Sequence, residues 1–172
     1  EVLVETGKAA GEFDAIVSAL GAVEGSAKTA AREVAALKEI AKQPGLGVQE
    51  AITGFTGLRR SGIDESVAMR LVRELGNQNA LAGGGKAELQ GLLLVFQQIA
   101  SKGRLQGEEA LQLAERGVPI YQMLKGAFGT SDTEKLARQG VNSDQIIAGL
   151  LGQMEKMPRV AGGAKNAFEN LQ

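Results

Sequence analysis

The sequence has no cysteine and no histidine. Without cysteine the chain can form no disulfide, and the redox state of its compartment cannot be inferred from the sequence. Without histidine it lacks the commonest general acid–base group and the commonest metal ligand. These absences argue against an enzyme, and we expect no catalytic residues, no metal site and no cofactor.

Aromatic residues are scarce, at 3% of 172 residues, with no tryptophan and one tyrosine. The apolar fraction of 44% is ordinary for a globular protein. Alanine, leucine, isoleucine and valine must therefore form the core. Because small side chains bury less apolar area per contact, we expect that core to be thin or elongated.

The sequence also lacks an excess of charge of one sign and any long apolar run. The 19 basic and 20 acidic residues leave a net charge of −1, which gives nucleic acid no clustered positive surface to bind. The longest purely apolar run is 92–96, whereas a transmembrane helix needs about 20 residues. We expect no transmembrane segment in this piece. The first residue is Glu1 and no signal peptide follows, so we expect part of a longer polypeptide or a processed one.

Glycine is abundant, with 24 residues, and it is regularly placed. Four times a helical pattern ends in a basic residue, then glycine, then an apolar residue; these are 60–63, 102–105, 116–118 and 138–141. A glycine just after a helix takes the left-handed conformation without a clash, and the basic side chain faces the negative end of the helix dipole. Capping boxes are predicted at Asn142 with Gln145 and at Ser131 with Glu134.

Apolar residues recur at helical spacing and nowhere alternate as in a strand. The stripes predict helices over 8–21, 27–42, 65–80 and 86–102, and two more around 120–128 and 146–154. The predicted fold is all-α: short antiparallel helices joined by tight glycine-containing turns. We divide the chain into an N-terminal helical pair (1–43), a compact multi-helix domain (44–157) and a linker or the start of a next helix (158–172).

Two patterns could suggest chemistry, and each has a plainer explanation. Gly83, Gly84, Gly85 and Lys86 open a helix, but a phosphate-binding loop needs a glycine at position 80 and Ser or Thr after the lysine. We interpret this run as a flexible link between helices. The carboxylate pairs Glu108–Glu109 and Asp64–Glu65 are better explained as helix-start residues than as acid–base catalysts.

Two basic clusters and the tyrosine also have structural interpretations. The basic residues of the first cluster alternate with Glu33 and Glu39, which is typical of a solvated helix face. Tyr121 sits at helical spacing and is expected in a core or an interface with its hydroxyl at the edge. The two clusters are Lys28, Arg32, Lys38 and Lys42, and Arg59, Arg60, Arg70 and Arg73.

One stretch resembles a known family. The segments 97–109 (QQIASKGRLQGEE) and 112–124 (QLAERGVPIYQML) are similar to the folded helical domain on the N-terminal side of bacteriophage tail tape measure proteins. The similarity continues at Gly129, 136–140 and 146–150, and upstream at 37–41 and 58–63. It covers roughly 30–155.

The resemblance implies a structural domain that takes part in tail assembly, tail-length determination and genome ejection. It implies self-association, with tail tube, tail-tip or baseplate proteins and an assembly chaperone as further partners. DNA would be touched only inside the assembled tail. The implied location is the interior of the phage tail in the virion, after assembly in the bacterial cytoplasm. With its many glycine stops, this chain would be a folded domain and not the measuring rod itself.

Two alternatives remain open at this point. One is a helical adaptor or protein-binding module of cellular origin that holds a partner helix in a groove. The other is a fragment of a phage lysin.

Overall fold

The nine helices of the computed structural model follow one another with no strand between them, over the described residues 2–161. They are α1 (Val2–Glu24), α2 (Ala27–Ile40), α3 (Val48–Arg60), α4 (Glu65–Leu81), α5 (Lys86–Lys102), α6 (Gly107–Glu115), α7 (Ile120–Phe128), α8 (Thr133–Arg138) and α9 (Ser143–Met154). The all-α prediction is confirmed. Within this part of the chain, no helix combines the length and apolar character needed to cross a membrane.

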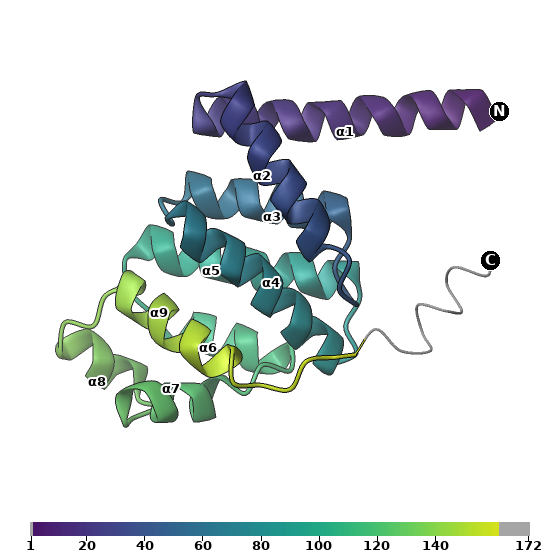
Figure 1. Cartoon of the computed structure of the whole chain (residues 1–172). Coiled ribbons are helices and arrows are strands. Elements are labelled where there is room, and N and C mark those ends of the chain that lie inside the picture. The colour runs from purple at the N-terminus through teal and green to yellow at the C-terminus, as the bar shows by residue number, and fades with distance from the viewer. Residues whose placement is uncertain (1, 162–172) are drawn as a thin grey trace.

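The helices pack in an order that places α1 at one end of the molecule (Figure 1). Helix α1 contacts α2 and α3, while α3 also packs on α4 and α5. At the other end, α9 packs on α4, α5 and α7, and α6 bridges α5, α7 and α8. One buried cluster runs through all of these layers, from Leu20 to Met154. Leucine, isoleucine, valine and alanine dominate it, with Phe55 and Phe96 as its aromatic members.

Helix ends follow local signals in most places. Gly62, Gly103, Gly117 and Gly140 all have positive φ, between 74° and 90°. The amide of Val118 returns to the carbonyl of Leu113, which satisfies a group that the end of α6 leaves free. The predicted box at the start of α9 is confirmed: the amide of Gln145 donates to Asn142 Oδ1 at 2.9 Å, and the amide of Asn142 donates to Gln145 Oε1 at 3.0 Å.

Two local predictions are wrong. Asp132, not Ser131, caps α8 and accepts from the amide of Lys135 at 3.1 Å, because a carboxylate makes a stronger, charge-assisted bond to the helix start. The first helix is Val2–Glu24 and not 8–21: residues without an inward stripe still propagate a helix that is already nucleated. Asp64 and Glu65 do stand at the start of α4, as expected, although the side chain of Asp64 at the N-cap makes no capping bond.

The division of the chain into parts stays a prediction. Helices α1 and α2 contact each other and also α3, so the predicted pair 1–43 packs directly on the predicted compact domain. Most of the predicted linker 158–172 lies outside the described residues, which end at 161.

Candidate assembly surface

The glycine-rich run before α5 is a turn between two helices. Gly83 has φ +71°, and the amide of Gly84 donates to the carbonyl of Asn79 at the end of α4. Asn79 in turn donates from Nδ2 to the carbonyls of Gly84 and Gly85. Lys86 is exposed, with its Nζ 3.7 Å from a carboxylate oxygen of Glu50. Helix α4, and not a strand, precedes the run, so it lacks the framework of a phosphate-binding loop.

The carboxylates considered for acid–base chemistry are either separated from one another or paired with a basic side chain. Glu109 is buried and accepts from Lys102 Nζ and from the amide of Gln106, whereas the adjacent Glu108 is exposed. Glu65 pairs with Arg32, 2.5 Å from Oε1 to Nη1. Among residues 2–161 no group of three or more acidic side chains could hold a metal ion. The geometry thus brings no two of the predicted carboxylates together for catalysis.

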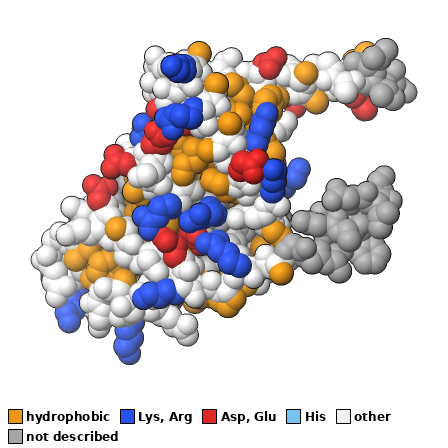
Figure 2. Space-filling view, viewed as in Figure 1, with side chains coloured by type: hydrophobic (Ala, Val, Ile, Leu, Met, Phe, Trp, Pro, Cys, Tyr) orange, Lys and Arg blue, Asp and Glu red, His pale blue; other side chains and the backbone are white. Residues whose placement is uncertain are grey.

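The two basic clusters do not form a continuous positive surface. Arg59 pairs with Glu24, Arg70 with Glu155 and Arg73 with Glu74, each on a different neighbour. Just after α2, Lys42 pairs with Glu39, and on α2 itself the Nζ of Lys38 lies 5.2 Å from the centre of the Phe13 ring. In Figure 2 basic and acidic side chains lie beside one another across the visible face. Such an interleaved surface gives little sequence-independent attraction for DNA.

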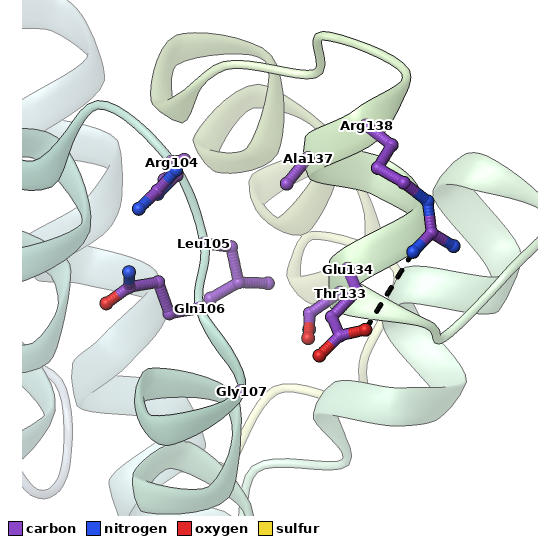
Figure 3. A pocket seen from close by; sticks show the side chains of 8 residues that line it. All are labelled: Arg104, Leu105, Gln106, Gly107, Thr133, Glu134, Ala137 and Arg138. Carbon is purple, nitrogen blue, oxygen red and sulfur yellow. Dashed lines mark ion pairs between the residues drawn. The ribbon is translucent and has the colours of Figure 1, made fainter.

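A groove lies between the loop that precedes α6 and helix α8, with a volume of about 410 Å³. In Figure 3 Leu105 points toward α8, while Arg104 and Gln106 turn away from it. Glu134 pairs with Arg138 at 3.8 Å on the α8 side of the groove. The groove therefore has an apolar wall and one exposed ion pair, and its polar groups do not converge on a point where a substrate would react.

Helix α1 is the most unusual surface feature. Its N-terminal part extends beyond the rest of the molecule (Figure 1), and every residue from 4 to 12 is exposed, with Val4 at 75%. Five of these nine residues are alanine, valine or glycine, and three are charged. The helix as a whole is apolar in composition, and such a helix normally has a neighbour to bury against. Among residues 2–161, the C-terminal half of α1 packs on neighbouring helices, with Leu20 fully buried and Phe13, Ile16 and Val17 partly buried.

Two shallow grooves flank that anchored half. On one side Ile16 and Ala19 face Thr56 and Arg60 of α3 across a space of about 250 Å³. On the other side Gly21 and the start of α2 enclose about 470 Å³. Hydrophobic side chains gather on the visible face where α1 meets α2 (Figure 2). We define the assembly surface as residues 4–21 of α1 together with these two grooves.

A charged junction anchors the base of this surface. Arg59 donates from Nε and Nη2 to the carboxylate of Glu24, at 2.6 and 3.0 Å, and from Nη1 to the carbonyl of Ile63 at 2.8 Å. The hydrogen bonds from Arg59 lower the pKa of Glu24, and those from Arg32 lower the pKa of Glu65. These two bidentate pairs tie α1 to α3 and α2 to α4.

Glu33 lies at the same junction, close to the carboxylate of Glu24. Its side chain is 0% exposed, and both carboxylate oxygens lack a hydrogen-bond donor. Burial, reinforced by the negative charges of Glu24 and Glu65, raises its pKa from 4.5 to about 7. A carboxyl in this position is neutral below that pH and becomes a buried charge above it.

The sequence analysis predicted Glu33 on a solvated helix face, whereas the structure buries it. It made no prediction for Glu74 and Asn77, which are also buried. A signal for Glu33 was present, because it lies three residues after Ala30 and four before Leu37, a spacing that places it on the same helix face. Tyr121 is 44% exposed on α7, so it lies outside the core formed by residues 2–161, and its place in an interface stays a prediction.

Comparison with known proteins places these features in a family. A family model described as "Tape measure protein" matches residues 5–172. A protein named "Probable tape measure protein" from Salmonella phage Felix O1 (isolate Felix O1-VT1) is 31% identical over 87 residues. That match covers 48% of this chain and 12% of the phage protein, so the chain spans a small part of its relative's length. No solved structure matches the chain.

The predicted resemblance is confirmed, since the family model covers nearly the whole chain. The chain belongs to the bacteriophage tape measure protein family, and it is an all-helical part of a phage tail component.

Proposed function

We propose that this chain is a structural, non-catalytic domain of a protein that takes part in tail assembly, tail-length determination and genome ejection. The observation that carries the proposal is the family match over residues 5–172, combined with the exposure of residues 4–12 of the largely apolar helix α1. Because the relative is much longer than this chain, the measuring rod belongs to other parts of such a protein. With 23 residues, α1 spans about 35 Å, and the helices after it pack back into one body.

The assembly surface is the proposed contact with other tail components. A second copy of the chain is its first partner, because α1 carries both the apolar residues that need burial and carboxylates at Glu5, Glu12 and Asp14. These carboxylates complement Arg60, which lines the α1–α3 groove. The tail tube, the tail-tip or baseplate proteins and an assembly chaperone are the remaining proposed partners. DNA contact is confined to the assembled tail, and assembly takes place in the host cytoplasm.

The test introduces a charge on α1 and a matched charge elsewhere. Val4→Lys places a lysine on the exposed part of α1, and Leu111→Lys does the same on α6, where the leucine is 52% exposed. Sedimentation analysis of the purified chain should show self-association that Val4→Lys weakens and Leu111→Lys leaves intact. A wild-type chain that stays monomeric at all concentrations would overturn the proposed α1 contact.

Tail assembly gives a second readout. Phages that carry Val4→Lys should yield fewer complete tails, but those tails should have the normal length, because the domain is not the rod. Tails of altered length would contradict the assignment of the measuring rod to other parts of the protein.

Zymography tests the alternative of a lysin fragment. The chain should produce no clear zone on peptidoglycan, and a clear zone would favour a lysin fragment instead.

A further inference from the structure

The chain that leaves α9 is bound to α4 by its backbone. Asn77, near the end of α4, is 4% exposed and makes two hydrogen bonds to this segment. Its Nδ2 donates to the carbonyl of Pro158 at 3.0 Å, and its Oδ1 accepts from the amide of Val160, also at 3.0 Å. The two bonds hold residues 158–160 in one extended register, as a neighbouring strand would. Figure 1 shows this segment running beside α4 after α9 ends.

A second contact lies one helical turn earlier on α4. Glu74 Oε1 accepts from Arg159 Nη2 and from Arg73 Nε. The Glu74 side chain is 0% exposed, although the side chains of Arg73 and Arg159 are 45% and 47% exposed. The carboxylate therefore lies underneath the two guanidinium groups. Gln43 supports the arrangement by donating from Nε2 to the carbonyl of Arg73 at 2.7 Å.

The chemistry of this contact differs from that of the core. Removing residues 158–160 from α4 would uncover the Glu74 carboxylate and the Asn77 amide, which water can solvate. Opening is therefore much less costly than unfolding a helix, and it falls in the range of local openings that leave the fold intact. Glu74 Oε2 has no hydrogen-bond partner in the closed arrangement, so water would also satisfy an atom that closure leaves unpaired.

We propose that residues 158–160 form a releasable strap whose binding site is the polar face of α4 at Glu74 and Asn77. The ligand class of this site is an extended peptide with an arginine in its middle position, and the chain supplies that peptide itself. Closure sets the point and direction at which the chain leaves the helical body. Opening frees the segment while α1 to α9 stay folded.

The experiment measures hydrogen exchange of the Val160 amide in the full chain by NMR. Asn77→Ala removes both backbone contacts and should speed exchange of this amide about tenfold or more, since each hydrogen bond contributes on the order of 1 kcal/mol. Arg159→Ala removes only the contact to Glu74 and should speed it by a smaller factor. Because Arg159 is exposed outside the helices, this variant keeps the result interpretable if Asn77→Ala folds poorly.

The matched control is Asn79→Ala. Asn79 is a second buried asparagine of α4, and its Nδ2 holds the α4–α5 turn instead of the strap. This variant should leave Val160 exchange unchanged relative to the core amides. Equal acceleration of Val160 in Asn77→Ala and Asn79→Ala, or acceleration of the α4 and α9 core amides together with Val160, would overturn the strap and show only general destabilisation.

Discussion

Glu33 should make the stability of the domain fall as the pH rises through the neutral range. Its carboxyl is buried at the junction of α1, α2 and α3 without a hydrogen-bond donor, and its pKa rises from 4.5 in the unfolded chain to about 7 in the folded one. When the folded-state pKa of an acid is raised, the folded state binds the proton more tightly than the unfolded state. Stability is then highest below the unfolded pKa, falls between the two values and is constant above the folded one.

The size of the effect follows from the two pKa values. Each pKa difference of one corresponds to 1.36 kcal/mol, so the full change from 4.5 to about 7 costs about 3 kcal/mol. Between about pH 5.5 and about pH 8, roughly 2 kcal/mol of this cost develops. The lower limit avoids a second effect, because the lowered pKa values of Glu24 and Glu65 remove stability only when the pH falls through them.

The assay is urea unfolding followed by circular dichroism for the wild type, Glu33→Gln and Glu39→Gln. Glutamine cannot ionise, so Glu33→Gln should lose about 2 kcal/mol less stability than the wild type over this pH range. Glu39→Gln removes an exposed carboxylate from the same helix and keeps Glu33, so it should follow the wild type. Equal pH dependence of the wild type and Glu33→Gln would refute the reasoning, whatever their absolute stabilities.

Two further pairs of variants test packing and capping. Gly54→Ala places a Cβ 2.4 Å from Leu93 Cδ1 and should destabilise the chain by about 1–2 kcal/mol in thermal unfolding. In Gly152→Ala the new Cβ meets no atom within 4 Å, so this variant should be neutral or more stable by about 0.5–1 kcal/mol. Asn142→Ala removes the cap of α9 and should lower the free energy of unfolding in urea by about 1 kcal/mol. Ser131→Ala should leave this free energy unchanged, because Asp132 caps α8. A loss of stability in Ser131→Ala larger than that in Asn142→Ala would support the predicted capping box at Ser131.

The sequence by itself was enough for what depends on neighbouring residues. Helical spacing of apolar residues indicated an all-α protein, because a side chain's place on a helix face depends only on its position in the helix. The reciprocal bonds of Asn142 and Gln145 span three residues and were predicted for the same reason. The ordered identities in 97–124 indicated the family, which the match over residues 5–172 confirms.

Only the tertiary structure decided which charges and surfaces are used. Arg59 meets Glu24 from 35 positions away, and Arg159 meets Glu74 from 85 positions away, so no local pattern could reveal either pair. Glu33 looked solvated in the sequence, yet the packing of α1 and α3 against α2 buries it. The exposed half of α1 is the converse case. Its residues continue the helix that the packed half of α1 begins, but the packing of the other helices decides which part of α1 is buried.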